Sequence, residues 1–273
     1  MAECNHDCEH CSVAEGCESK IIKAKLNDRS KIGKIICVLS GKGGVGKSYI
    51  TSLLAVYLNR QGYKVGIMDA DITGPSIPKA FGIKEKAYGE EGLIYPLLSN
   101  GGIKIMSANC LLENESDPIV WRGPLLGGLI KQFYEDVLWE ELDYLLIDMP
   151  PGTGDVALTV FQQLPVDDLI IVTSPQDLVS LIVTKAIKMA NMMNIKTLGV
   201  IENMSYLNCP DCGKKIPLFG ESHLEEFAKS MNFNILAKLP LVSANTTLVD
   251  QGLVEQVSLD EILPAVEAIK KEA

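Results

Sequence analysis

The stretch GKGGVGKS, residues 41–48, decides the fold. It matches the pattern G-x-x-x-x-G-K-[ST] of a phosphate-binding loop. The apolar run KIICVLS (34–40) before it is typical of a buried strand, and residues 48–62 after it have helical periodicity. Because the motif requires this strand–loop–helix context, we predict that the glycines turn backbone N–H groups onto phosphate oxygens at the N-terminus of a helix.

The side chains of this loop add a charge and a metal ligand to the backbone cradle. Lys47 is expected to reach the β- and γ-phosphates of a nucleotide, and the Ser48 hydroxyl is expected to ligate Mg²⁺. A plain phosphate-binding loop does not require the second lysine, Lys42, and a solvated loop lysine is the plainer interpretation of that residue alone. The residues expected to surround the nucleotide are Gly41, Lys42, Gly43, Gly44, Val45, Gly46, Lys47 and Ser48.

Carboxylates follow two of the other apolar runs. Asp69 and Asp71 come directly after the run 63–68, and Asp148 ends the run 143–147. In a parallel sheet, the carboxyl ends of the strands face the nucleotide. Asp69 and Asp71 can therefore hold the waters of Mg²⁺ and orient an attacking water, and Asp148 can hold Mg²⁺ through a water, as phosphoryl transfer requires. A helix-capping or turn pair is the alternative for Asp69 and Asp71.

Two further residues lie near the ends of predicted strands. Asn203 comes at the tip of the predicted strand 196–202, and its amide offers both a donor and an acceptor, which suits the edge of an adenine. A turn or capping asparagine is the alternative. Pro240 comes just after the predicted strand 234–238.

Six of the eight cysteines fall into two clusters. The first cluster, in residues 1–19, consists of Cys4, Cys8, Cys11 and Cys17. This segment has almost no apolar side chains, so it cannot fold by burying them. Its four thiolates can wrap one metal centre, and the segment would then fold around that centre. A [4Fe–4S] cluster, a tetrahedral Zn²⁺ with or without a histidine ligand, and an inert disordered tail remain alternatives. Residues 20–33 are expected to link this segment to a domain over residues 34–273.

The second cluster is the pair Cys209 and Cys212 in CPDC, within a loop expected over residues 206–220. Such a pair is half a site, because zinc and [4Fe–4S] centres take four protein ligands. The other ligands can come from the N-terminal cysteines or from a second copy of the chain, since a two-fold dimer brings two copies of one patch together. A redox disulfide partnership is the remaining alternative.

The composition sets the class of molecule. A length of 273 residues with 47% hydrophobic content allows one large α/β domain and a small appendage. The alternation of strands and helices predicts a doubly wound, mostly parallel sheet of the P-loop NTPase type. The net charge of −10 argues against nucleic acid and anionic membranes as partners. With no signal peptide and no uncharged apolar run of about 18 residues, we expect a cytoplasmic protein without a membrane anchor.

Six motifs carry a family resemblance, and in order they are GKGGVGKS, DADITGPSIP, WRGP, DMPPGTGD, ENMS and CPDC. They resemble those of the Mrp/ApbC/NBP-type iron–sulfur carrier ATPases over residues 30–270. The first is similar to the deviant Walker A loop of the MinD/ParA/nitrogenase iron protein class, in which the extra lysine reaches the partner's nucleotide. The resemblance thus implies a homodimer in which Lys42 acts beside Lys47. The gap between Cys4 and Cys8 is shorter than in eukaryotic NBP-type members.

The resemblance also implies roles for the other candidates. Asp71 would position the hydrolytic water, while Asp69 would support the metal and the loop. Asn203 would recognise the base, and Pro240 would pack against the adenine. The CPDC pair would hold a labile [4Fe–4S] cluster that bridges two protomers.

The implied function is that of an iron–sulfur cluster carrier. The homodimer would bind Mg·ATP, hydrolyse it slowly, and assemble a [4Fe–4S] cluster or transfer it to apo-proteins. Two other functions remain open, namely a MinD/ParA-like regulatory ATPase with structural zinc and an ATP-driven electron-transfer protein. Neither the recipient proteins nor the role of Arg122 follows from the sequence.

Overall fold

The structure is a computed structural model, and it describes residues 23–72, 74, 76–111, 123–175, 179–220 and 222–271. The four N-terminal cysteines predicted to hold a metal centre lie outside these residues, and so does Arg122.

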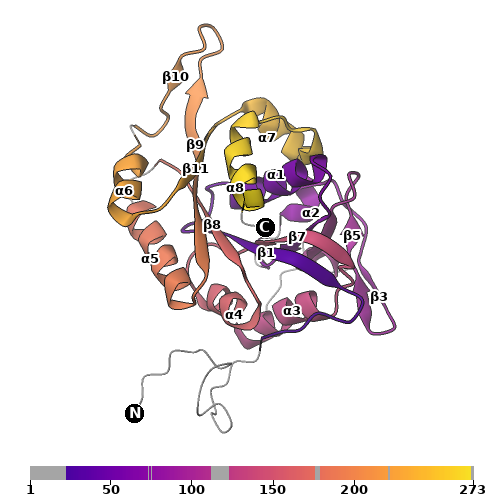
Figure 1. Cartoon of the computed structure of the whole chain (residues 1–273). Coiled ribbons are helices and arrows are strands. Elements are labelled where there is room, and N and C mark those ends of the chain that lie inside the picture. The colour runs from indigo at the N-terminus through magenta and orange to yellow at the C-terminus, as the bar shows by residue number, and fades with distance from the viewer. Residues whose placement is uncertain are drawn as a thin grey trace, which may run out of the picture.

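A nine-stranded sheet forms the centre of the molecule (Figure 1). Its strands are β1 (Lys31–Ser40), β2 (Val65–Asp69), β5 (Leu97–Leu98), β6 (Lys104–Ser107), β7 (Glu141–Asp148), β8 (Asp168–Thr173), β9 (Lys196–Asn208), β10 (Lys215–Ile216) and β11 (Ile235–Pro240). They follow the order β10-β9-β8-β1-β7-β2-β6-β5, and β11 pairs with β9. Only β9–β10 and β5–β6 pair antiparallel among these strands. A two-stranded hairpin, β3 (Tyr88–Glu90) and β4 (Leu93–Tyr95), forms a second sheet.

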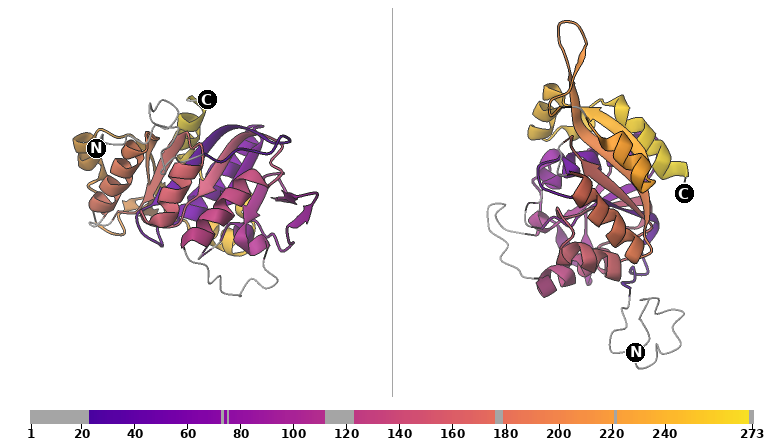
Figure 2. Two further views of the ribbon diagram at one scale, coloured as in Figure 1. Left: turned by 90° about the horizontal axis from the view of Figure 1, so that it is seen from below. Right: turned by 90° about the vertical axis from the view of Figure 1, so that its left-hand side faces the viewer.

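Helices cover both faces of the sheet (Figure 2). They are α1 (Lys47–Arg60), α2 (Ile77–Ala80), α3 (Gly123–Glu135), α4 (Asp155–Gln163), α5 (Val179–Met192), α6 (Leu224–Met231), α7 (Ser243–Asp250) and α8 (Leu263–Lys271), with 3₁₀ turns at Ala108–Cys110, Val254–Gln256 and Asp260–Ile262. Side chains of α1, α2 and α8 share one core cluster, and those of α3, α4, α5 and α6 share the other. None of the described helices is long and apolar enough to cross a membrane.

Strand β1 explains why both faces need cover. Its side chains alternate between the two cores, with Ile36 and Val38 on the α1 side and Ile35, Cys37 and Leu39 on the other. A strand buried on both faces reads as a continuous apolar run, as parallel strands under two helix layers do. The predicted doubly wound α/β fold is confirmed.

Residues 23–30 of the predicted linker lie against the domain, and its last three residues belong to β1. The Ala24 N–H donates to the Gln163 carbonyl at 2.7 Å, and the Asn27 side chain donates to the Glu135 and Val137 carbonyls at 2.8 and 2.9 Å. Strand β1 begins at Lys31, earlier than the sequence pattern indicates.

Strand β9 is longer than predicted. It runs to Asn208, so the prediction that Asn203 stands at a strand tip is wrong. The polar sequence after residue 202 gives no strand signal of its own, but neighbouring strands supply backbone partners. Tyr206 pairs with Pro240 of β11, and its carbonyl accepts the Leu241 N–H at 2.8 Å.

The end of β9 continues into an arm that projects beyond the helical layers (Figure 1). We call residues 206–220 the cysteine arm. Strand β10 returns antiparallel along β9, with Ile216 paired to Leu207. Every residue from 210 to 220 is exposed, including the apolar side chains of Leu218 and Phe219. The cysteine pair therefore lies on an arm that the rest of the described chain leaves largely uncovered.

Candidate functional site

The phosphate-binding loop joins β1 to α1 in the predicted way. Gly44 and Gly46 both have a φ of +82°, which glycine adopts without steric cost. A Cβ on Gly46 would lie 2.3 Å from the Asn203 Nδ2 atom, so no side chain fits there. Cβ atoms on Gly43 and Gly44 would meet nothing within 4 Å, so on that side the loop backbone is open to a phosphate.

A cluster of charged and hydroxyl side chains lies at the carboxyl ends of the strands. The Lys47 Nζ atom is 2.7 Å from Asp148 Oδ2 and 3.6 Å from Asp71 Oδ2. The Ser48 hydroxyl donates to Asp148 Oδ2 at 2.5 Å. Asp148 is fully buried, so its charge depends on these partners. The structure thus brings together the loop lysine, the predicted Mg²⁺ ligands and the residue predicted to orient water.

Asp69 lies beside Asp148, because the two are direct partners across β2 and β7. One Asp69 oxygen accepts the Ser107 hydroxyl at 3.1 Å, and the other accepts the Asp71 N–H at 3.1 Å. Burial, and then the charge of Asp148, raise the pKa of Asp69 to about 8, against the opposing effect of Lys47. Two carboxylates this close favour a bound cation, whose charge would compensate both.

Lys42 is the second residue of the loop and is partly exposed. Its carbonyl accepts the Ser40 hydroxyl at 3.0 Å, and the Ser40 carbonyl accepts the Gly152 N–H at 2.7 Å. The turn after β7 is thereby attached to the phosphate-binding loop through Ser40. This places the DMPPGTGD motif beside the phosphate-binding loop.

Asn203 contacts the loop directly. Its Nδ2 atom donates to the Val45 carbonyl at 2.9 Å, and its side chain is buried. The amide therefore supports the loop backbone in this structure, and base recognition by Asn203 stays a prediction. Pro240 is the last residue of β11 and is buried. Its predicted contact with adenine also stays a prediction.

Sequence reasoning missed two hydroxyl residues of the site. Thr51 donates to Asp148 Oδ1 at 2.7 Å, and Ser107 holds Asp69. The sequence did contain a signal for Ser107. This residue ends β6, the neighbour of β2 in the sheet, and so lies at the same edge as the carboxylates. Thr51 had only its place one turn after the loop lysine. Neither contact can be assigned without the strand order.

The contact between Thr51 and Asp148 gives a test of the metal site. The variant Thr51→Val removes the hydroxyl while keeping the shape, and is expected to weaken Mg²⁺-dependent nucleotide binding by about 10- to 100-fold, the usual effect of losing an outer partner of a metal ligand. Thr51→Ser keeps the hydroxyl and is the control. Titration of bound nucleotide against Mg²⁺ measures the effect. Equal Mg²⁺ dependence in both variants would contradict this role.

The cysteine arm presents two free thiols. Cys209 is half-buried and Cys212 is exposed. Hydrogen bonds from the backbone of Cys212 and Asp211, and then from the Cys212 thiol, lower the pKa of Cys209. The turn is closed by the Gly213 N–H on the Cys209 carbonyl at 2.8 Å. A thiolate held by N–H donors is the form that binds metals.

The cysteine pair remains a half site in the described chain. No group of three or more His, Cys, Asp and Glu side chains among the described residues could hold a metal ion. Ligands from outside the arm, from the N-terminal cysteines or from a second copy of the chain, therefore stay a prediction. The two remaining described cysteines, Cys37 and Cys110, are buried in the core and cannot supply them.

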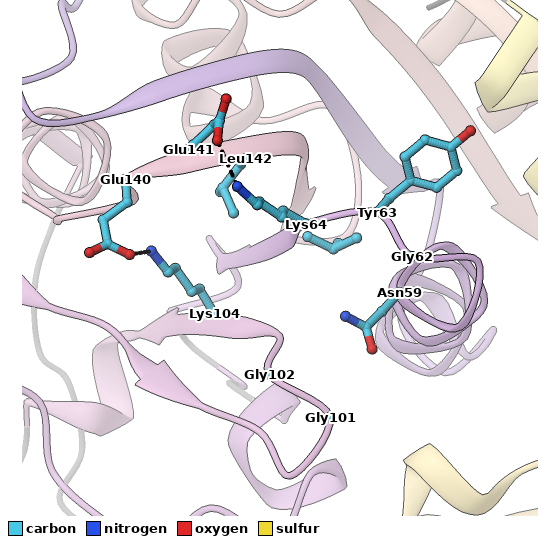
Figure 3. Close-up of a pocket in the computed structure, with 11 residues that line it drawn as sticks. Asn59, Gly62, Tyr63, Lys64, Gly101, Gly102, Lys104, Glu140, Glu141 and Leu142 are labelled. Carbon is cyan, nitrogen blue, oxygen red and sulfur yellow. Dashed lines mark hydrogen bonds and ion pairs between the residues drawn. The ribbon is translucent and has the colours of Figure 1, made fainter.

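A pocket of about 420 Å³ lies at the other end of the sheet, away from the phosphate-binding loop (Figure 3). Two lysines line it, and each is paired with a glutamate, Lys64 with Glu141 at 2.6 Å and Lys104 with Glu140 at 2.5 Å. Because both cations are already paired, this pocket offers no free charge to a phosphate. It is separate from the site described above.

Comparisons with known proteins identify the family of the chain. A family model of the ParA group, described as NUBPL iron-transfer P-loop NTPase, matches residues 31–272. The iron–sulfur cluster carrier protein of Clostridium perfringens is 45% identical over 257 residues, which cover 91% of this chain and 90% of that protein.

Two solved structures are similar to this chain in fold, one of them with bound nucleotide. The nucleotide-binding protein of Archaeoglobus fulgidus, solved in complex with ADP, is 45% identical with a TM-score of 0.74, covering 82% of this chain and 88% of that one. The cell division ATPase MinD of Pyrococcus furiosus is 20% identical with a TM-score of 0.61, covering 88% of this chain and 100% of that one, and shows the fold alone. Because the family model matches residues 31–272 and the carrier protein is 45% identical in sequence, the chain belongs to the family of NUBPL iron-transfer P-loop NTPases.

Proposed function

We propose that this protein is an ATP-dependent iron–sulfur cluster carrier. It binds and slowly hydrolyses Mg·ATP, holds a [4Fe–4S] cluster on the cysteine arm between two protomers, and delivers that cluster to apo-proteins. The observation that carries the proposal is the position of half-buried Cys209 and exposed Cys212 on an arm whose supporting strand, β9, also contacts the phosphate-binding loop.

The nucleotide part rests on the loop and its carboxylates. The open side of Gly43 and Gly44 accepts the phosphates, and Lys47 lies within reach of them. Ser48 and Asp148 would hold Mg²⁺, which neutralises charge on the phosphates. Asp71 would orient the attacking water. The ADP bound by the Archaeoglobus protein supports the same use of this chain.

The cluster part rests on the chemistry of the arm. Two thiols, one with a lowered pKa, suit a soft metal ligand set, and their exposure suits a cargo that must be loaded and released. The carrier named in Clostridium perfringens, with 45% identity over 91% of this chain, supports iron–sulfur cargo over structural zinc. The N-terminal cysteines would bind a second [4Fe–4S] cluster or Zn²⁺.

The dimer part follows from the half site. A two-fold axis at the arm brings two pairs together and completes a set of four thiolates. The same arrangement would allow Lys42 to reach the nucleotide of the partner. The thiols of Cys209 and Cys212 suit the reducing cytoplasm, where we place the protein.

Cluster transfer tests the proposal. Protein loaded with iron and sulfide without oxygen is mixed with an apo-ferredoxin, which is then separated and its visible absorption recorded. We expect the ferredoxin to gain its cluster, at a rate that changes with Mg·ATP. A loaded protein that keeps its iron in the presence of the acceptor, with or without nucleotide, would rule out the carrier function.

A further inference from the structure

Strand β9 contains a bulge between the phosphate-binding loop and the cysteine arm. Met204 has a φ of 57°, and among the five described non-glycine residues with positive φ it alone lies inside a strand. The register with β11 shifts at this point, from Glu202 opposite Lys238 to Tyr206 opposite Pro240. A left-handed methionine costs free energy and persists only where its surroundings enforce it.

On one side, the bulge contacts the phosphate-binding loop. The Asn203 amide holds the Val45 carbonyl. A Cβ on Gly46 would lie 2.3 Å from Asn203 Nδ2 and 3.8 Å from Met204 Cε, so both side chains lie close to Gly46. A change in the loop backbone on binding phosphate must therefore move these two residues or break their contacts.

On the other side, the bulge fixes the base of the arm. The Glu202 carboxylate is buried, with 2% of the residue exposed. One of its oxygens accepts the Ser205 hydroxyl at 2.6 Å, and the other accepts the Ser222 hydroxyl. Ser205 precedes the cysteine arm and Ser222 follows it. One buried carboxylate thus ties together the two chain segments from which the arm projects.

We propose that residues 202–205 couple the nucleotide site to the cysteine pair, with Glu202 as the positioning residue of the arm. Phosphate at the loop shifts Asn203, the bulge at Met204 converts this shift into a change of direction in β9, and Glu202 transmits it to both segments at the base of the arm. The accessibility of Cys209 and Cys212 then depends on bound nucleotide. The proposal rests on the proposed function, and it names the residues that regulate that site.

The test measures thiol reactivity in the full-length protein after metal removal by a chelator. Cys209 and Cys212 are alkylated with iodoacetamide, with and without Mg·ADP, and the rate for their peptide is followed by mass spectrometry. We expect bound ADP to change this rate by about fivefold or more, the lower range of coupling between two sites. Ser222→Ala is expected to abolish the change while ADP binding, measured by equilibrium dialysis, is retained.

Three variants separate coupling from general damage. Ser222→Thr keeps the hydroxyl and is expected to restore the response, and Ser205→Ala, which removes the other hydroxyl, is expected to abolish it. Ser230→Ala removes a hydroxyl on α6 that donates to the Phe227 carbonyl at 2.8 Å, and is expected to respond like the native protein.

Two results would overturn the coupling. One is bound ADP with no change in alkylation of the native protein, and the other is an undiminished response in both Ser222→Ala and Ser205→Ala. Either result leaves the carrier function standing, because iron uptake and transfer are measured separately. Failure of ADP to bind at all would overturn the nucleotide part of the proposed function, and the coupling with it.

Discussion

Replacing Cys209 with alanine is expected to remove the cluster from the cysteine arm and to abolish transfer to an apo-acceptor. A [4Fe–4S] cluster shared by two protomers amounts to about two irons per protomer, and its four thiolates come from both chains. Losing one thiolate from each chain leaves two ligands, too few for the cluster. Iron and sulfide analysis after anaerobic loading, compared with the native protein, measures the loss.

The matched control is Cys110→Ala. Cys110 is 2% exposed, so its thiol cannot reach a shared cluster, and this variant is expected to keep its iron and its transfer activity. Cys212→Ser should lose the same amount of iron as Cys209→Ala, because both residues serve one cluster. Unchanged transfer by the Cys209 variant would show that the arm does not carry the cargo.

Asp71→Asn is expected to slow ATP hydrolysis by about 10²- to 10⁴-fold, the usual contribution of a positioned acid–base group, while nucleotide binding is retained. The reason is geometric. The Asp71 Oδ2 atom lies 3.6 Å from the Lys47 Nζ atom, and the Asp71 side chain is 14% exposed. It can therefore orient a water at the terminal phosphate. Asparagine keeps the size of the side chain but cannot accept a proton from that water.

Phosphate release under saturating Mg·ATP measures this effect, with ADP binding measured on the same preparations. Asp28→Asn, an exposed carboxylate before β1, is the control and is expected to hydrolyse ATP at the native rate. Hydrolysis by Asp71→Asn at the native rate would assign the positioning of water to another residue. Loss of nucleotide binding together with hydrolysis would instead indicate a structural role for Asp71.

Local sequence was enough for the framework of this molecule. The phosphate-binding loop follows from its glycines, because other residues do not easily adopt their left-handed backbone. The strand before the loop follows from its apolar run, because a strand buried on both faces needs apolar side chains throughout. The carboxyl ends of parallel strands share one edge, so the meeting of Asp69 and Asp148 also followed from the pattern. These features depend on residue type and on the periodicity of single elements.

Other features depend on which strands become neighbours. The extension of β9 past Asn203 is driven by pairing with β10 and β11, which lie later in the sequence. The hydrogen bond from Thr51 to Asp148 joins residues 97 positions apart. Glu202 accepts a hydrogen bond from Ser222, although the whole cysteine arm separates the two residues in the sequence. No local pattern contains such contacts, because they arise only when the sheet is assembled.

A metal count on the native protein tests most directly whether it carries an iron–sulfur cluster. It would be purified and loaded with iron and sulfide without oxygen, and its iron, sulfide and zinc would be measured per protomer together with the visible spectrum. We expect a brown protein with at least about two irons per protomer, the share of one bridging [4Fe–4S] cluster, and matching sulfide. A colourless protein that holds zinc tightly and takes up no iron would contradict this expectation.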